Sequence, residues 1–409
     1  MKLVILTQYY PPEIGAPQNR LHDLAVRLRD KGVDVIVLTG MPNYPHMEVH
    51  PEYKHKLYFK ERIDGIPVHR SWLWVKNARR NIALRILCYL SFTFTSLLIG
   101  AFKLPRLDFI LCESPPLSLG LTGLILARLK SGRFILNIAD IWPDGAVELG
   151  VISEGFLVRL TRRFEKWIYR KSDLISGQTR GIGAHVKKHF PEKHVHLLRN
   201  GVDLSMFEPA YEDTGWRKKR GFSKSDRLFL FGGILGFLVG LEVVLYAADK
   251  LRDHRDIKFL IFGQGPEKEG LIALKNELML NNIFFFDPVP RSAMPEMISA
   301  CDVGLMPMRR AEFLKGAIPS KSFEYLAMER PILLGAEGEA KELLIDDAGA
   351  GLAFEPENPD DLAEKVLLLS NAPDLRKKLG TAGRKAAKLR FDRAIIAERF
   401  FDFLNQRSR

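Results

Sequence analysis

Residues 313–327 read FLKGAIPSKSFEYLA and gather two lysines, Lys315 and Lys321, around one short loop. Pro319 and Ser320 suit the first turn of a helix, whose unpaired N–H groups and dipole attract anions. The two lysines add full positive charges at the same place. The stretch therefore predicts a binding site for a phosphate or diphosphate group.

Glu324 lies three residues after Lys321 on one face of the expected helix, which Pro331 should end at Arg330. A carboxylate at this position can accept hydrogen bonds from two adjacent hydroxyl groups, as on a ribose. The alternative is an exposed Lys321–Glu324 ion pair, worth less than ~1 kcal/mol. The Gly-Ala-Ile-Pro-Ser sequence before the helix favours the binding interpretation.

Three other loops follow apolar runs and carry candidate residues. Gly15, in QYYPPEIGAPQNR, lets the backbone approach a ligand closely, although the loop by itself is more typical of a simple entry into a helix. Asp140, in NIADIWPDG, could orient or deprotonate an acceptor hydroxyl, whereas Asp144 fits a helix cap or a surface turn better. Gly263 and Gly265, in FGQGPE, allow close contact with a phosphate or sugar, but a single GxG is weak evidence.

The elements that must position these loops alternate between short apolar runs and amphipathic helices. Such alternation predicts an α/β fold with parallel sheets covered on both faces. Ten runs are too many for one comfortable sheet, so we expect two Rossmann-like doubly wound domains that face each other across a cleft, with ligands beyond the strand ends. The expected strands are 2–7, 33–40, 108–113, 133–140, 173–179, 228–234, 257–265, 282–289, 302–308 and 331–336.

The domain boundary is expected near LRNGVDLSMFEPAYEDTG, because Asn-Gly, a proline and a polar stretch separate the two series of strands there. The predicted division is an acceptor-binding domain over 1–200 and a nucleotide-sugar-binding domain over 201–384. Residues 385–409 form a basic helical pattern that should pack back on the first domain.

Composition narrows the classes of partner. The chain has 409 residues and a formal net charge of +12, which suits nucleic acid, an anionic membrane or phosphorylated small molecules. The sequence has no nucleic-acid-binding motif, so we expect no nucleic acid partner. The three cysteines lie far apart, which is typical of reduced, cytoplasmic proteins, and the start does not resemble a signal peptide. His185 and His189 lack an acidic partner or an HExxH pattern, so no metal site is expected.

The segment 86–102 contains seventeen uncharged residues, fewer than the ~20 that a membrane-spanning helix needs. It is either a buried helix over the first sheet or a monotopic helix that dips into a bilayer. A spanning helix fits least, because a strand of the sheet follows at once. Basic residues that would meet anionic headgroups flank the segment at Lys76, Arg79, Arg80, Arg85, Lys103 and Arg106.

In chain order, the stretches PPEIGAPQNR, DIWPD, RNGVDLSMFEP, FGQGP and GAIPSKSFEYLAMERPIL resemble the GT-B glycosyltransferases of family 4. The branch they resemble builds bacterial O-antigen, capsule and exopolysaccharide. The resemblance spans nearly the whole chain, and its most specific parts are NGVD with Phe207 and Pro209, and the GAIPSKSFEYLA block.

The resemblance implies a retaining, metal-independent transfer, with the nucleotide-sugar donor held mainly by the second domain and the acceptor by the first. It implies that Glu324 binds the donor ribose, that Gly15 faces the donor phosphate, and that Asp140 lies beside the anomeric carbon. The expected catalytic residues are Asp140, Lys321 and Glu324. The expected donor-binding residues are Gly15, Gly263, Gly265, Val289, Arg291, Lys315, Gly316, Ala317, Ile318, Pro319 and Ser320.

The chain departs from the family pattern at three places. Gly316 stands where the family often has the first glutamate of a Glu-x7-Glu motif. Gly233 and Val239 stand where it often has an Arg and a Lys that hold the diphosphate, and a frequent active-site histidine is replaced in the IADIW segment. The loss of the basic pair leaves more of the diphosphate charge to the two lysines of the loop and to Arg291.

These observations together predict a cytoplasmic glycosyltransferase, peripheral to the inner face of the plasma membrane and without a cofactor. It would move an N-acetylhexosamine or deoxyhexosamine from a UDP donor to a polyprenyl-diphosphate-linked acceptor. One alternative is a nucleotide-sugar epimerase on the same fold, which leaves the apolar segment 86–102 unexplained. The other is a non-catalytic GT-B scaffold protein of a glycan-assembly complex, which the departures favour.

Overall fold

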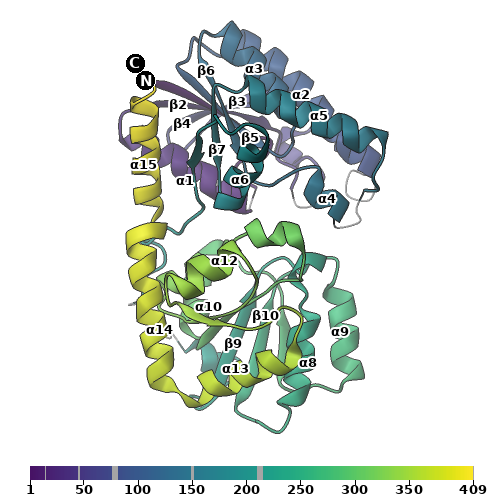
Figure 1. The fold of residues 1–409 in the computed structure, drawn as a ribbon, viewed down its shortest axis with the longest axis vertical. Coiled ribbons are helices and arrows are strands. Elements are labelled where there is room, and N and C mark those ends of the chain that lie inside the picture. The colour runs from purple at the N-terminus through teal and green to yellow at the C-terminus, as the bar shows by residue number, and fades with distance from the viewer. Residues whose placement is uncertain (14, 45–46, 76–81, 149–151, 210–214, 409) are drawn as a thin grey trace. The chain divides into compact units, whose positions relative to one another are not determined.

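A computed structural model describes residues 1–408 except 14, 45–46, 76–81, 149–151 and 210–214. The chain forms two compact units: Met1–Asn200 together with Arg393–Arg409, and Gly201–Asp392. Each unit is a largely parallel sheet between layers of helices (Figure 1), which confirms the predicted pair of doubly wound α/β domains.

The first unit contains an eight-stranded sheet in the order β3-β4-β2-β1-β5-β6-β7-β8. Its strands run parallel except β3, which pairs antiparallel with β4 at one edge. Leu3 of β1 lies beside Val35 of β2 and Phe109 of β5. The strands are β1 (Lys2–Leu6), β2 (Asp34–Gly40), β3 (Tyr58–Ile63), β4 (Ile66–Ser71), β5 (Phe109–Ser114), β6 (Arg133–Ile138), β7 (Leu174–Gly177) and β8 (Val195–Leu197).

Both faces of this sheet are buried, because helices cover each of them. Successive residues of a strand point to opposite faces. Leu3 and Ile5 pack with α1 and α15, while Val4 and Leu6 pack with α2, α3, α5 and α6. The helices are α1 (Ala16–Asp30), α2 (Ile82–Lys103), α3 (Leu119–Leu129), α4 (Asp144–Glu148), α5 (Phe156–Lys171), α6 (Arg180–His189) and α15 (Arg393–Asn405).

The second unit contains a six-stranded parallel sheet in the order β11-β10-β9-β12-β13-β14. Leu230 of β9 faces α10 and α11, and Phe229 faces α8, α9 and α13. The strands are β9 (Arg227–Gly232), β10 (Ile257–Phe262), β11 (Ile283–Phe286), β12 (Val303–Pro307), β13 (Ile332–Gly335) and β14 (Gly351–Ala353). The helices are α7 (Trp216–Lys219), α8 (Glu242–Lys250), α9 (Lys268–Glu277), α10 (Met294–Ser299), α11 (Lys321–Ala327), α12 (Glu339–Lys341), α13 (Pro359–Asn371) and α14 (Pro373–Ala386).

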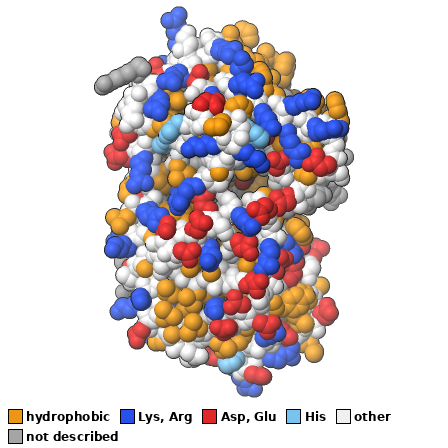
Figure 2. Space-filling model, viewed as in Figure 1, with side chains coloured by type: hydrophobic (Ala, Val, Ile, Leu, Met, Phe, Trp, Pro, Cys, Tyr) orange, Lys and Arg blue, Asp and Glu red, His pale blue; other side chains and the backbone are white. Residues whose placement is uncertain are grey.

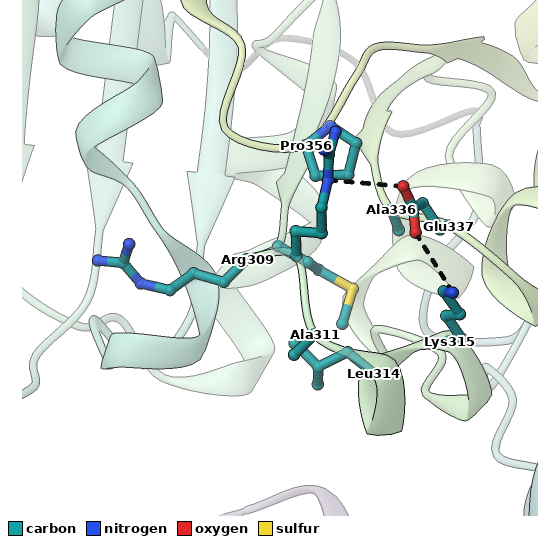
Figure 3. Close-up of a pocket in the computed structure, with 9 residues that line it drawn as sticks. Arg309, Ala311, Leu314, Lys315, Ala336, Glu337 and Pro356 are labelled. Atoms are coloured by element: carbon teal, nitrogen blue, oxygen red, sulfur yellow. Dashed lines mark ion pairs between the residues drawn. The ribbon is translucent and has the colours of Figure 1, made fainter. Parts of the chain in front are cut away.

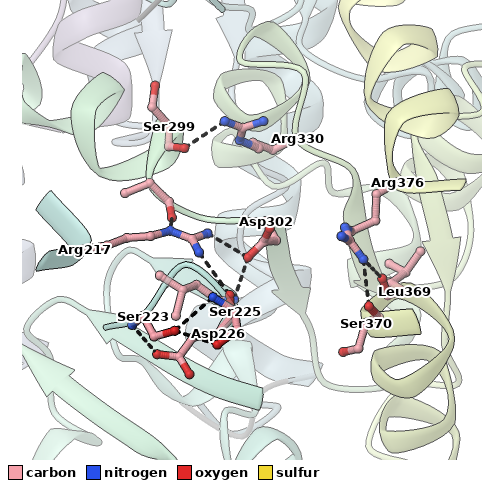
Figure 4. Close-up of polar contacts among 12 residues, drawn as sticks. Arg217, Ser223, Ser225, Asp226, Ser299, Asp302, Arg330, Leu369, Ser370 and Arg376 are labelled. Carbon is pink, nitrogen blue, oxygen red and sulfur yellow. Dashed lines mark hydrogen bonds and ion pairs between the residues drawn. The ribbon is translucent and has the colours of Figure 1, made fainter. Parts of the chain in front are cut away.

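The amino ends of the strands in the second unit are held by a polar network around Asp302 (Figure 4). The Asp302 carboxylate accepts hydrogen bonds from Arg217 Nη2 and from the Leu228 N–H, both at 2.8 Å. Arg217 also donates to the Ala300 carbonyl, and Arg330 donates to the Ser299 carbonyl. These contacts fix the edge of the sheet opposite to the strand ends at which ligands are expected.

Four strands were not predicted, namely β3, β4, β8 and β14. The edge strand β3 alternates half-buried and exposed positions, and β4 buries the polar His69 and Arg70. The other two are three residues long. None of the four is a continuous apolar run, the pattern that predicts a buried strand.

Two predicted boundaries were wrong. Helix α11 ends at Ala327 rather than at Arg330, because Glu329 adopts a left-handed conformation with φ of 54°. Residues 385–392 belong to the second unit, where Phe391 packs on Phe323 with ring centroids 4.8 Å apart. Of the C-terminal segment, the part that belongs to the first unit begins at Arg393 with α15, which packs on α1.

Candidate functional site

The strands of the second unit end along one edge of its sheet. The loops at this edge, here called the second-unit edge, are residues 232–241, 263–268, 287–293, 308–320 and 336–339. Parallel strands bring their carboxyl ends together, so most of the predicted donor-binding residues lie on this one edge.

The loop before α11 presents backbone donors. Residues Glu312–Gly316 form a 3-10 turn, and the Ala317 N–H donates to the Leu314 carbonyl at 2.9 Å. Among the residues that the structure describes, the N–H groups of Ile318 and Ser320 make no hydrogen bond. The loop thus has two donors available for an anion, although α11 itself is only seven residues long.

Helix α11 is fixed firmly behind this loop. Tyr325 is fully buried and donates its hydroxyl to the Leu230 carbonyl at 3.0 Å, and burial raises the pKa of this phenol well above its usual range. Ser322 donates from its N–H and its hydroxyl to the Pro319 carbonyl. The positions of Lys321 and Glu324 are therefore set by a rigid element.

The Lys321–Glu324 ion pair, which the sequence offered as the alternative to ligand binding, is present. Lys321 Nζ lies 3.4 Å from Glu324 Oε2, and the Glu324 side chain is 16% exposed. Glu324 Oε1 makes no hydrogen bond to the described part of the chain. One carboxylate oxygen is therefore available for a hydroxyl donor while the other is paired.

Lys315 lies in a pocket whose lining combines apolar residues with the charged Arg309, Arg310 and Glu337 (Figure 3). Its Nζ is 2.6 Å from Glu312 and 3.9 Å from Glu337, and Glu337 also lies 3.6 Å from Arg310. The side chain of Arg309 points away from this group, toward Glu242 at 2.7 Å. The sequence offered the Lys321–Glu324 pair but did not reveal that Glu337, which follows the next strand, also lies near Lys315.

The glycines of the second-unit edge are explained by backbone packing. Gly263 has a φ of 155°, and a Cβ there would lie 1.9 Å from the Gly233 carbonyl oxygen. A Cβ on Gly265 would lie 2.1 Å from the Leu235 carbonyl oxygen. These glycines are required by the protein itself, so they provide no separate argument for a ligand.

Val289 and Arg291 follow β11 at the same edge. Val289 packs against the core of the second unit, and Arg291 is half-buried at the start of a 3-10 turn. The Nε atom of Arg291 is buried and has no hydrogen-bond partner among the described residues. Arg291 thus differs from Lys315 and Lys321, which both have carboxylate partners.

The first unit has a corresponding edge, here called the first-unit edge, formed by residues 7–15, 41–44, 72–75, 113–118 and 137–144 where those residues are described. Gly15 immediately precedes the 15-residue helix α1, whose N-terminus has no side-chain cap. A Cβ on Gly15 would lie 2.4 Å from Oε1 of Gln18. The Gly15 position therefore combines close packing with an uncapped helix end.

Glu13 connects two loops of the first-unit edge. Its carboxylate accepts hydrogen bonds from the backbone N–H groups of Asn43 and Tyr44, both at 2.8 Å, and of Tyr10 at 3.1 Å. Burial raises the pKa of Glu13 to about 7, although the three N–H groups and the Arg70 charge favour its ionised form. The sequence does not indicate this residue, because two of its three partners, Asn43 and Tyr44, lie about thirty positions away along the chain.

A buried polar network lies under the ends of β5, β6 and β7. Glu113 forms an ion pair with Arg20 of α1 and accepts a hydrogen bond from Asn137 Nδ2. Asn137 Oδ1 in turn accepts from the Ser176 hydroxyl at 2.8 Å. Burial raises the pKa of Glu113, and Arg20 and Asn137 oppose this shift.

Asp140 lies at the surface above this network. The pairing of β5 with β6 ends at Ile138, and the Ala139 N–H still donates to the Ser114 carbonyl at 2.8 Å. Asp140 is therefore the second residue after the paired strand. Desolvation raises the pKa of Asp140, and Arg20 opposes the shift. Asp144 instead starts α4 and pairs with Arg162 Nε at 2.6 Å, which agrees with a structural role.

The histidine pair has an acidic neighbour that was not expected. His185 Nε2 lies 3.2 Å from the buried Glu165, which also accepts a hydrogen bond from Tyr169. The expectation of no acidic partner is therefore wrong for His185. Among the described residues, the structure has no cluster of three or more His, Cys, Asp or Glu side chains arranged for a metal ion.

Comparisons with known proteins match both halves of the chain. The glycosyl transferase 4-like domain matches residues 15–201, and the glycosyl transferases group 1 domain matches residues 212–386. The putative colanic acid biosynthesis glycosyl transferase WcaI of Escherichia coli is 25% identical over 98% of this chain and 99% of its own length. The uncharacterized glycosyltransferase MJ1178 of Methanocaldococcus jannaschii is 30% identical over 65% of this chain and 67% of its own length.

The solved structure of HepE from Anabaena, in complex with UDP-glucose, superposes with a TM-score of 0.73. It covers 99% of this chain and 100% of its own chain at 14% sequence identity. At this identity the likeness concerns the fold.

Proposed function

Because the chain belongs to the GT-B glycosyltransferases of family 4, we propose that it transfers an N-acetylhexosamine or deoxyhexosamine from a UDP donor to a polyprenyl-diphosphate-linked acceptor, with retention of configuration. The enzyme is a glycosyltransferase of polysaccharide biosynthesis. The observation that carries the proposal is the match of both domain profiles, which together extend from residue 15 to residue 386. The two relatives are named glycosyltransferases, which supports transfer over the epimerase and scaffold alternatives.

The donor diphosphate is proposed to bind at the second-unit edge. Breakage of the bond between the sugar C1 and the diphosphate oxygen leaves negative charge on the departing UDP. The N–H groups of Ile318 and Ser320 and the unpaired Nε–H of Arg291 are donors suited to that charge. Lys321, already 3.4 Å from Glu324, adds a cation next to the carboxylate that would hold the ribose hydroxyls. This arrangement supports a donor site without a metal ion.

The acceptor is proposed to bind at the first-unit edge, with Asp140 as the base. As the bond between C1 and the diphosphate oxygen breaks and UDP departs, the acceptor oxygen would bond to C1 from the same face, which retains the configuration. The Asp140 carboxylate would take the proton of that hydroxyl. Desolvation raises the pKa of Asp140 from its ordinary value, which makes its carboxylate a stronger base. The raised pKa and the position at a strand end support this role.

The acceptor lipid is proposed to reach the enzyme at a membrane-facing surface of the first unit. Helix α2 leaves an apolar stripe exposed, with Phe94 62% and Phe102 82% accessible. Helix α5 adds exposed Phe156, Leu157 and Leu160 beside basic residues. Figure 2 shows blue basic and orange apolar side chains side by side over the part of the first unit where Figure 1 labels α3 and α5. Such a surface suits an anionic bilayer. The flanking Lys76, Arg79 and Arg80 lie outside the described residues.

The polar contacts of α2 support a monotopic rather than a spanning arrangement. By length and composition, Ala83–Lys103 is apolar enough to cross a membrane, and 22% of its most apolar window is buried. The helix is, however, bonded to its neighbours: Thr122 Oγ1 donates to the Thr93 carbonyl at 2.7 Å, and Lys130 Nζ donates to the Ala101 carbonyl at 2.7 Å. Moving α2 into a bilayer would break these bonds and expose the sheet beneath, so a spanning helix fits less well. The exposed Phe94 and Phe102 fit a fully buried helix less well.

A transfer assay with radiolabelled nucleotide sugars and membrane lipid extract of the source organism tests the proposal. We expect label to enter the lipid fraction with a UDP-sugar, and UDP to raise the melting temperature of the protein. The proposal fails if no UDP-sugar supports transfer and uridine nucleotides leave the melting temperature unchanged.

Binding to vesicles tests the membrane component separately. Vesicles that contain an anionic phospholipid should sediment the wild type, whereas Phe94→Ser/Phe102→Ser should remain in solution. Tyr246→Ser, on the exposed surface of α8, is the matched control and should sediment like the wild type. Equal sedimentation of all three proteins would contradict the proposed surface.

A further inference from the structure

The buried network under Asp140 contains an ion pair whose purpose the reaction itself does not explain. Arg20 is 5% exposed and Glu113 is 3% exposed, so both charges are buried at the carboxyl end of β5. A buried ion pair is weak evidence for stability, because desolvation of the two charges can exceed their attraction. A role in setting the properties of a neighbouring group accounts for the pair better.

The strand pairing places the network beside Asp140. Glu113 of β5 lies next to Asn137 of β6 in the sheet, and the Ala139 N–H reaches back to the Ser114 carbonyl. Asp140 therefore extends from a backbone position that is fixed on both strands. Arg20 approaches from α1, in the first turns after Gly15.

Arg20 is not fully satisfied by Glu113. Its Nη2 group makes the ion pair, while Nη1 is buried and has no hydrogen-bond partner among the described residues. A buried, unpartnered guanidinium N–H group is costly unless something accepts its hydrogen bond. A carboxylate or a substrate oxygen at the strand end would be such an acceptor.

The two charges act on Asp140 in opposite directions. Arg20 lowers the pKa of Asp140, whereas the charges of Glu113 and Asp140 repel each other and raise the pKa of Glu113. Cys112, behind Glu113, is fully buried and the pKa of its thiol is raised well above the usual range, so it stays neutral. Arg20 of α1 thus acts directly on Asp140, and the charge repulsion couples Asp140 to Glu113 of β5.

We propose that Arg20 and Glu113 are positioning residues that hold Asp140 and set the pH range in which its carboxylate works as a base. Arg20 attracts the carboxylate, and Glu113 limits that attraction by neutralising part of the Arg20 charge. The inference rests on the proposed function of Asp140 and adds two residues that the family resemblance did not indicate.

The test is the pH profile of kcat/KM for three variants of the full chain. Because Asp140 acts when it is deprotonated, activity rises with pH through its titration. Arg20→Gln should move this rising limb to higher pH by about one unit, and Glu113→Gln should move it to lower pH by about one unit. Ser176→Ala removes a hydrogen bond of the same network without changing a charge, so its profile should match the wild type.

A purely structural role would lower the activity of Arg20→Gln and Glu113→Gln without moving their profiles in opposite directions, and that result overturns the inference. Carboxyl ¹³C NMR of Asp140 in the same proteins gives a second readout that does not depend on activity. If Asp140→Asn keeps full activity, the proposed role of Asp140 as the base fails. In that case, opposite shifts of the Asp140 titration in Arg20→Gln and Glu113→Gln still support the coupling of the three charges. Unchanged titration in both variants overturns the coupling as well.

Discussion

The two strand-end edges are built in different ways. The first-unit edge contains the buried Glu13 and Glu113 and rests on the buried Arg20 of α1 and Arg70 of β4. These side chains form ion pairs or hydrogen bonds to the backbone. The second-unit edge consists of backbone amides and closely packed glycines, while the Lys315 and Lys321 side chains are partly exposed and paired with glutamates.

This difference assigns different tasks to the two edges. Buried ionisable groups have shifted pKa values, as Glu13 and Glu113 show, and such groups are suited to proton transfer or to tuning a neighbour that transfers a proton. Backbone donors and paired surface charges change little with pH and are suited to holding a diphosphate by shape. We therefore expect the pH dependence of the enzyme to originate mainly in the first unit.

The largest expected effect is the loss of the buried Arg70 at the first-unit edge. Arg70 is completely buried, forms an ion pair with Glu61 and donates to the Gly40 carbonyl at 3.1 Å. Arg70→Met should lower the free energy of unfolding by about 3–5 kcal/mol. The reason is that the Glu61 carboxylate and the Gly40 carbonyl would lose the cation that they bind. Urea denaturation measures it, with the exposed Arg62→Met on β3 as a control that changes little. A loss below ~1 kcal/mol would show that this edge does not depend on buried charge.

A comparable test of the second-unit edge replaces a glycine. Gly263→Ala should destabilise the protein by about 2–4 kcal/mol, because its Cβ would collide with the Gly233 carbonyl at a φ of 155°. Gly270→Ala, in α9, meets nothing within 4 Å and should stabilise by about 0.5–1 kcal/mol. Thermal melts of the two variants should therefore move in opposite directions, and a neutral Gly263→Ala would contradict the packing described for the edge.

The pH dependence of stability should reflect Glu13. Its pKa in the folded state is about 7, above the ordinary 4.5, so the folded protein keeps a proton that the unfolded chain releases. The contribution of Glu13 is therefore fully present below pH 4.5 and falls as the pH rises to 7, by at most about 3 kcal/mol. Glu13→Gln should resemble the wild type at low pH and become relatively more stable toward pH 7, as denaturation at a series of pH values would show.

Asp287, at the second-unit edge, provides the control. Lys268 lowers the pKa of Asp287, so any contribution of this carboxylate is lost on acidification below its ordinary pKa of 3.8. Asp287→Asn should leave the slope between pH 4.5 and 7 as in the wild type. If Glu13→Gln also leaves that slope unchanged, the assignment of this pH dependence to the first unit is wrong.

The smallest effect is expected for the exposed lysine of the second-unit edge. Lys315→Met breaks an exposed pair with Glu312 and should change the free energy of unfolding by less than ~1 kcal/mol. If Lys315 contacts the diphosphate, Lys315→Met should raise the KM for the donor, and this change, expressed as a free energy, should exceed the loss of stability. A measurable loss of stability with an unchanged KM would reverse that assignment.

Much of the fold could be predicted because the central strands are apolar runs that are buried on both faces, as Leu3 to Leu6 illustrate. The polar strand β4 could not, because His69 and Arg70 are buried only by virtue of tertiary partners such as Glu61. The candidate loop 313–327 was found from local residue types. The Arg20–Glu113 pair, 93 residues apart, has no local signal and required the sheet order.

The most direct test of the central claim is calorimetric titration of UDP into the wild type and into Glu324→Ala. The account predicts that the variant binds UDP about 10–100-fold more weakly, because a charged acceptor of the ribose hydroxyls is lost. Glu269→Ala, in α9, should bind UDP like the wild type. Equal dissociation constants for the wild type and Glu324→Ala would contradict a donor site at the second-unit edge.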